Sequence, residues 1–112
     1  MGRQKGIGIV TVAAAGTPVR VTATETWCES YMVGPWTTAA ASNTGRMFVG
    51  ITAAAFKAGT AGLLGIIPIP TANVSAVFSS GKGSNGSHSF NLADLYIDSE
   101  VNGESVYVSY TG

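Results

Sequence analysis

Cys28 and His88 are the sole cysteine and the sole histidine of this 112-residue chain, so thiol–imidazole catalysis would need these two side chains themselves. A CxxC zinc site or an internal disulfide needs a second cysteine, which excludes both within one chain. Cys28 falls in an expected strand, where we predict a buried thiol that packs as a small apolar group. We interpret His88 as a solvated loop residue and expect neither an enzyme nor a cofactor.

Residues 81–86, Gly-Lys-Gly-Ser-Asn-Gly, match the dinucleotide pattern G-x-G-x-x-G letter for letter. The pattern binds a pyrophosphate when its glycines lie between a strand and the N-terminus of a helix. Residues 87–91 show no helical period, and Gly83 follows Lys82 where a Walker motif needs Ser or Thr. We therefore interpret residues 80–87 as an exposed loop rather than a nucleotide site.

Carboxylates gather near the C-terminus, where calcium binding is conceivable: Asp94, Asp98, Glu100 and Glu104. Their spacing is not that of an EF-hand loop. An acidic edge that discourages pairing between sheets explains the same residues, and this is the favoured interpretation. We expect no metal site.

Three aromatic side chains fall close together in the sequence and could form a stacking platform for sugars: Trp27, Tyr31 and Trp36. The alternative is that they fill the core where two sheets meet. Core packing is the favoured interpretation of the three.

The composition predicts one all-β domain. Hydrophobic residues make up 46% of the chain and glycine supplies 15 residues, which argues against disorder and against long helices. The net charge is zero and only 11% of the residues are charged, so the sequence predicts no broad positive surface that would attract phosphates. Nucleic acid is therefore not an expected partner. No segment holds the roughly 20 apolar residues of a membrane-spanning helix, so no membrane partner is expected. The opening residues imitate a secretory signal, but a β-branched strand over 7–12 explains them better, and we expect a soluble, unprocessed chain.

Alternating apolar residues and turn signals predict about seven or eight strands in an antiparallel β-sandwich or small barrel, with at most one short helical turn. Nine segments are candidates for these seven or eight strands: 7–12, 19–24, 26–33, 36–41, 46–51, 63–67, 74–79, 95–98 and 105–110. The helical candidate is 52–59, Gly34-Pro35 is an expected turn, and 63–67 is expected at a sheet edge because prolines follow it. Asn102-Gly103 predicts a tight hairpin between the last two strands. The organisation we expect is an N-terminal arm and first strand over 1–16, followed by a β-sandwich domain over 17–112.

Charge is distributed unevenly along the chain. Arg3, Lys5 and Arg20 give the first 20 residues a charge of +3, while residues 94–104 hold four acids and no base. These opposite signs could pair within one subunit or between neighbours. The side chains we expect to reach a partner are five cations and one tryptophan: Arg3, Lys5, Arg20, Trp36, Arg46 and Lys82.

Several segments together resemble small virion structural proteins of tailed bacteriophages over roughly residues 17–110. They are Thr-Pro-Val-Arg-Val at 17–21, Asn-Thr-Gly-Arg-Met-Phe-Val-Gly at 43–50, the apolar glycine-containing run at 62–68, and the ending at 91–110 with its Asn-Gly turn. The resemblance implies a β-sandwich without catalysis that decorates or cements the capsid, often as a trimer bound to the major capsid protein. Similar domains occur in tail, neck and fibre components.

The leading hypothesis is therefore a capsid decoration or cement protein on the virion surface. We expect it to form a homo-oligomer, a trimer around a symmetry axis. Runs of alanine at 13–15, 39–41 and 53–55 would allow close approach of neighbouring chains, and a positive mean hydropathy leaves apolar surface for a neighbour. The alternative is a tail, neck or fibre component that connects virion parts or binds host glycans through the aromatic residues or the 80–88 loop.

Overall fold

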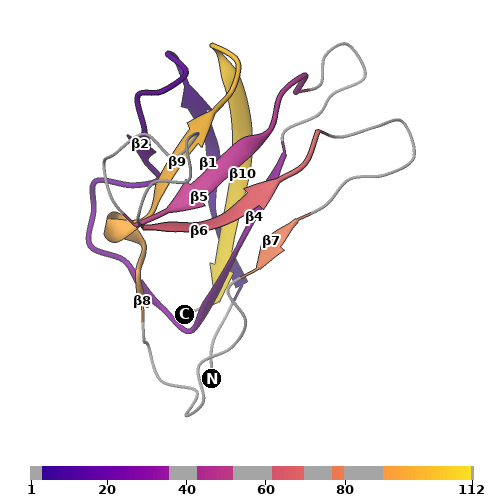
Figure 1. Cartoon of the computed structure of the whole chain (residues 1–112). Coiled ribbons are helices and arrows are strands. Elements are labelled where there is room, and N and C mark those ends of the chain that lie inside the picture. The colour runs from indigo at the N-terminus through magenta and orange to yellow at the C-terminus, as the bar shows by residue number, and fades with distance from the viewer. Residues whose placement is uncertain (1–3, 36–42, 52–61, 70–76, 80–89, 112) are drawn as a thin grey trace.

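Antiparallel strands form the whole framework of the computed structural model, which describes residues 4–35, 43–51, 62–69, 77–79 and 90–111 (Figure 1). The elements are β1 (Gln4–Val12), β2 (Val19–Arg20), β3 (Trp27–Cys28), β4 (Ser30–Pro35), β5 (Met47–Gly50), β6 (Leu63–Ile67), β7 (Phe78–Ser79), β8 (Phe90–Asn91), the 3₁₀ turn η1 (Leu92–Asp94), β9 (Tyr96–Ser99) and β10 (Glu104–Thr111). Sheet A has the order β1-β10-β4-β7 and sheet B the order β2-β9-β5-β6, while β3 and β8 form a small separate ribbon. The predicted all-β, antiparallel sandwich is confirmed.

Both sheets combine strands from the beginning and the end of the chain. β1 pairs with β10, β2 with β9, β4 with β7, and β5 with β6. Contacts between β10 and β4 complete sheet A, and contacts between β9 and β5 complete sheet B. This nested order is that of a double-sheet jelly roll, in which Greek-key connections wrap the chain around one core.

The core lies between the two sheets. Along the strands that form it, buried residues alternate with residues on the outer face, as the sequence predicts. In β10, Val106 and Val108 are buried and face inward, whereas Tyr107 between them is half-buried on the outer face. Sheet B faces them with fully buried side chains of β5, β6 and β9: Met47, Val49, Ile67 and Ile97. Alternation at these positions therefore decides which face of each strand is buried.

A β-bulge near its start shapes β1. The register against β10 shifts between Gly6 and Gly8, and Gly8 adopts φ +107°, which a side chain would strain. The extra residue, Ile7, packs against the core, and Val10 and Val12 are buried there as well. Residues 4–12 of the expected N-terminal segment are thus part of sheet A.

Two expected strands differ from the prediction: one is shorter, and the other is interrupted. The strand expected over 19–24 stops at Arg20, because hydroxyl groups then compete for the backbone: Thr24 N donates to Thr22 Oγ1, and Thr26 Oγ1 donates to the Thr24 carbonyl. The strand expected over 26–33 breaks at Glu29, where the chain leaves β8 and joins β10.

Gly34-Pro35 is not a turn. Both residues belong to β4, and Pro35 is tolerated as the last residue of the strand, where it has no ladder bond to donate. Gly34 leaves room for the ring of Tyr107, which lies where a Cβ would stand.

The predicted hairpin at Asn102-Gly103 is wrong, because β9 belongs to sheet B and β10 to sheet A. Gly103 has φ +80°, but no residue other than glycine has a positive φ in the part that the structure describes, so Asn102 lacks the conformation of a type I′ turn. Gly103 N instead donates to the Val12 carbonyl and extends the β1–β10 ladder. The turn therefore links the two sheets.

Other expectations fall on segments that the structure does not describe. The helical candidate 52–59, the strand 36–41, most of 74–79 and the loop 80–87 lie outside the described residues. The sequence analysis did not place η1, whose first turn is capped by the Asn91 side chain accepting from Ala93 N.

Close packing at the β6 edge gives a first prediction. A Cβ at Gly65 would overlap the ring of Phe78 from the opposite sheet, so Gly65→Ala is expected to lower the free energy of unfolding by about 1–3 kcal/mol. Gly6→Ala is the matched control, because nothing lies within 4 Å of its Cβ position, and it should change stability by less than about 0.5 kcal/mol. Urea unfolding measures both; equal stability of the two variants would contradict the packing.

Candidate assembly surfaces

Cys28 is a buried thiol, as predicted. It lies in β3 with none of its surface exposed and packs in the core, and burial raises the pKa of the thiol. A protonated, inaccessible thiol is a poor nucleophile. His88 lies outside the described residues.

Tyr31 lies at the same end of the core, with its ring centroid 6.2 Å from that of Phe78 and 5.0 Å from that of Phe90. Burial, reinforced by the nearby Cys28, raises the pKa of Tyr31 to about 12. The unfolded value is near 10, so the stabilisation by the neutral phenol is complete below pH 10 and is lost as pH rises to about 12.

This shift predicts an alkaline weakness. Between pH 10 and 12 the wild-type chain is expected to lose on the order of 2 kcal/mol of unfolding free energy through Tyr31. Tyr31→Phe lacks the ionising group and should show a shallower decline in urea unfolding over the same interval. Parallel declines in the two proteins would contradict the assignment.

Three of the four C-terminal carboxylates position loops at one end of the sandwich. Glu104 accepts from Thr44 N at 2.6 Å, from Thr44 Oγ1 at 2.8 Å and from Gly45 N at 2.9 Å. Glu100 forms a two-pronged ion pair with Arg46, whose Nε and Nη2 donate at 3.0 and 2.8 Å. The acidic residues therefore organise turns, a use that the favoured interpretation as an acidic edge did not foresee.

Asp98 is fully buried beside this end. Its Oδ1 accepts from Gly16 N at 2.9 Å and from Ser99 N at 2.8 Å, while its Oδ2 has no hydrogen-bond partner among the residues that the structure describes. Those same residues contain no group of three or more potential metal-binding side chains. Asp98 thus ties the β1–β2 connection to sheet B.

Of the residues predicted to bind a partner, the structure describes Lys5, Arg20 and Arg46, and these three lie apart from one another. Arg20 lies over the ring of Tyr96 at 5.8 Å and donates to its hydroxyl, which raises the pKa of Arg20. Arg46 is paired with Glu100 and also lies over the Phe48 ring, on the same sheet but beside the opposite end of β9. Lys5 is exposed on β1 in sheet A. Arg3, Trp36 and Lys82 lie outside the described residues.

Of the three aromatic residues, the structure describes Tyr31 and Trp27, which differ in burial. Tyr31 is 4% exposed and belongs to the core, as expected. Trp27 was expected in the core as well, but it is 49% exposed, because β3 pairs with β8 in a ribbon beside the sandwich and turns Cys28 inward instead. Trp36 lies outside the described residues.

An apolar surface along β6 is the feature that sequence analysis missed. β6 is an edge strand, as predicted, and its inward positions are Gly65, which meets Phe78, and the buried Ile67. Alternation turns Leu64 and Ile66 to the outer face. We define the β6 apolar strip as four side chains, each between 43% and 49% exposed: Leu64 and Ile66 of β6, Ile69 just after it, and Ile51, which follows β5 and donates its backbone N–H to the Gly62 carbonyl just before β6. The signal was present in the sequence as an apolar run at an expected edge.

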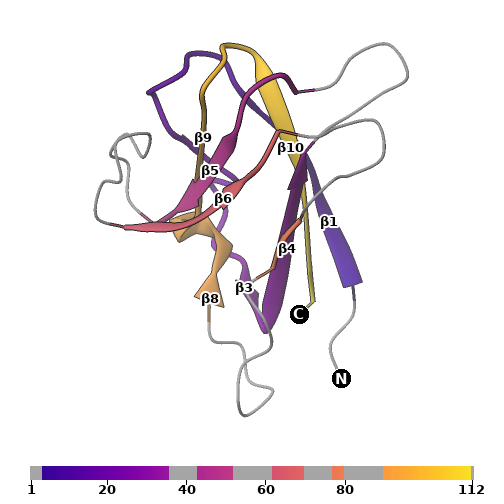
Figure 2. The same ribbon diagram turned by 45° about the vertical axis from the view of Figure 1, so that its right-hand side comes forward.

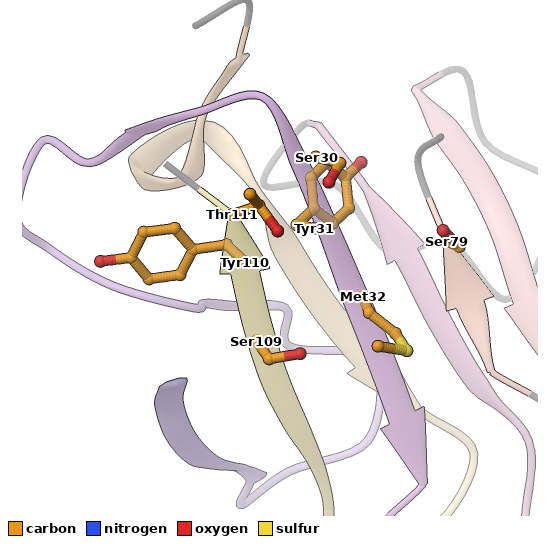
Figure 3. Close-up of a pocket in the computed structure, with 7 residues that line it drawn as sticks. All are labelled: Ser30, Tyr31, Met32, Ser79, Ser109, Tyr110 and Thr111. Carbon is orange, nitrogen blue, oxygen red and sulfur yellow. The ribbon is translucent and has the colours of Figure 1, made fainter. Parts of the chain in front are cut away.

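The outer face of sheet A carries a shallow, neutral pocket of about 130 Å³ (Figure 3). Small side chains of β10 and β4 line it, and Ser109 and Met32 point out side by side, whereas the ring of Tyr110 is turned away. Its lining residues are Ser30, Tyr31, Met32, Ser79, Ser109, Tyr110 and Thr111. The described residues that line it carry hydroxyl groups and a thioether, and none of them is charged.

Comparison with known proteins returns no family model, no curated protein and no solved structure that matches the chain. No helix among the described residues is long and apolar enough to cross a membrane. The fold places the protein in the class of all-β, antiparallel sandwiches. The exposed apolar side chains of the β6 apolar strip are the surface feature that the fold itself does not require.

Proposed function

We propose that the protein is a non-enzymatic structural protein of a tailed-phage virion, a capsid decoration or cement protein that binds the lattice of the major capsid protein as a homo-oligomer. The observation that carries this proposal is the β6 apolar strip, displayed at the edge of a rigid sandwich. Burial of a large aliphatic side chain contributes about 1.5–3 kcal/mol, so such a strip supplies adhesive energy without any chemistry.

The architecture supports the same proposal by analogy. Double-sheet jelly rolls are a common architecture of viral capsid domains, although the fold also occurs in lectins and enzymes, so the surface has to carry the argument. On a lattice, many contacts of modest strength act together, because each bound subunit raises the effective concentration of the next contact. A small protein with a few exposed aliphatic side chains fits that use.

Virions produced with this gene intact or deleted provide the test. With the gene intact, mass spectrometry of purified particles should find the chain in fixed proportion to the major capsid protein. Particles that lack the gene product should bind the purified protein until the same proportion is restored. Absence from intact particles, or binding that never saturates, would overturn the proposal.

A second candidate is a fibre or connector role that includes binding of host glycans, and the exposed Trp27 favours it. An exposed indole can stack on a sugar ring. A glycan array probed with wild type and Trp27→Ala separates the two: binding that disappears with Trp27 supports the glycan role, and absence of wild-type binding removes it.

A further inference from the structure

We propose that β1 pairs edge to edge and antiparallel with β1 of a second copy, so that sheet A continues across a two-fold axis. The inference names how copies meet within the proposed homo-oligomer. It rests on the edge of sheet A and not on the β6 apolar strip, so self-association and shell binding can fail separately.

β1 has an outer edge with which no other strand of the described residues pairs. It has nine residues and a register of eight pairs with β10 on one side, and it is the outermost strand of sheet A. Figure 2 shows β1 at the margin of that sheet, beside β10. An edge of this length presents a row of N–H and C=O groups that can accept another strand.

The usual protection of such an edge is weak here. Folded proteins block exposed edges with charges, prolines, bulges or very short strands. β1 has a bulge between Gly6 and Gly8, but no charged residue and no proline interrupts residues 8–12, which include four β-branched side chains in succession. Ile9 among them is 47% exposed on the outer face.

Strand length indicates that the strand pairing with β1 is β1 of a second copy. The other edge strands of the sandwich are much shorter: β2 and β7 have two residues each, and β6 has five. A head-to-tail ring, including the expected trimer, would have to join β1 to one of these short edges. Among the described edge strands, only another β1 matches its length, and an antiparallel pair of identical strands generates two-fold symmetry.

Charge favours the antiparallel direction. Lys5 lies near one end of β1, and the other end, Val12, pairs with Glu104 in β10. Seven residues of extended strand separate the two ends by roughly 23 Å, so Lys5 and Glu104 do not pair within one subunit. Among the described residues, the hydrogen-bond donors to Glu104 are the neutral groups of Thr44 and Gly45, so no cation of that part of the chain pairs with its carboxylate.

Antiparallel pairing places Lys5 of each copy at the acidic end of its neighbour. Parallel pairing would place the two lysines side by side, which like charges oppose.

Sedimentation equilibrium and hydrogen–deuterium exchange test the pairing on the full chain. Wild type is expected to be a dimer, and backbone amides of residues 8–12 should become more protected as protein concentration rises. Ile9→Lys should raise the dimer Kd at least tenfold, whereas Ile66→Lys, at a similarly exposed site on the other sheet, should leave it unchanged.

Several results would overturn the inference: a wild-type monomer, a trimer, or exchange in residues 8–12 that does not depend on concentration. The exchange measurement needs no substitution, so it decides the question even where Ile9→Lys disturbs the fold. If Ile9→Lys is monomeric but still binds virions, the capsid proposal stands without the pairing. If the wild type is a dimer that does not bind virions, the pairing stands and the capsid proposal fails.

Discussion

Replacing Asn43 with alanine is expected to lower the free energy of unfolding by about 2–5 kcal/mol. Asn43 is 5% exposed, and its side-chain amide holds one residue of β10: Nδ2 donates to the Ser105 carbonyl at 2.7 Å, and Oδ1 accepts from Ser105 N at 3.3 Å. The amide binds the backbone of Ser105 where a neighbouring strand would otherwise do so, because β4 ends at Pro35, which lies opposite Val106. Without it, one buried donor and one buried acceptor of the backbone lose their partner.

Ser105→Ala is the matched control for this prediction. It removes the hydroxyl contact with Thr11 Oγ1 at 2.7 Å but keeps both backbone bonds to Asn43, so a loss of about 1 kcal/mol is expected. Chemical unfolding monitored by circular dichroism compares the two variants. If Asn43→Ala costs no more than Ser105→Ala, the amide does not replace a strand.

Ile66→Asp is expected to weaken binding to the virion by about 10- to 150-fold, the equivalent of one buried aliphatic side chain. Ile66 faces outward on β6 with 45% of its surface exposed, so the substitution removes apolar contact area and adds a charge that binding would desolvate. Binding of purified protein to virions that lack the chain, followed by sedimentation, gives the affinity.

Ala23→Asp adds the same charge at an exposed position away from β6 and should bind like wild type. Leu64→Asp should reproduce the loss, since Leu64 lies two residues along the same face. Unchanged binding by both strip variants, with their folds intact by circular dichroism, would exclude the β6 apolar strip as the contact surface.

Much of the fold follows from local pattern. The alternation of Val106, Tyr107 and Val108 predicts a half-buried strand, and the structure places both valines in the core. The prolines after Ile67 predict an edge strand, and β6 is one. These predictions succeed because a period of two and the missing N–H of proline are properties of the chain itself.

Assignments that depend on partners far along the chain could not be made from the sequence. Asn102-Gly103 favours a hairpin locally, but β9 finds β5 and β10 finds β4, so the turn joins different sheets. Trp27 looks like a core residue until the small β3–β8 ribbon leaves it exposed. Long-range pairing overrides local preference in both cases.

The candidate surface could be foreseen only in part. The sequence shows an apolar run over residues 63–67, but whether alternate side chains face a second layer or solvent depends on what covers the sheet. The acidic residues posed a similar problem, since Glu104 and Asp98 bind backbone N–H groups of residues 60 and 82 positions away. No spacing rule predicts such contacts.

Thermal disruption of virions measures the proposed role most directly. Virions lacking the chain are heated after incubation with wild type, with Ile66→Asp or with buffer, and release of DNA is recorded. Wild type is expected to raise the temperature of release, whereas Ile66→Asp should leave it at the value of the untreated particles. Equal release temperatures for all three samples, with wild type bound at saturation, would contradict a stabilising function.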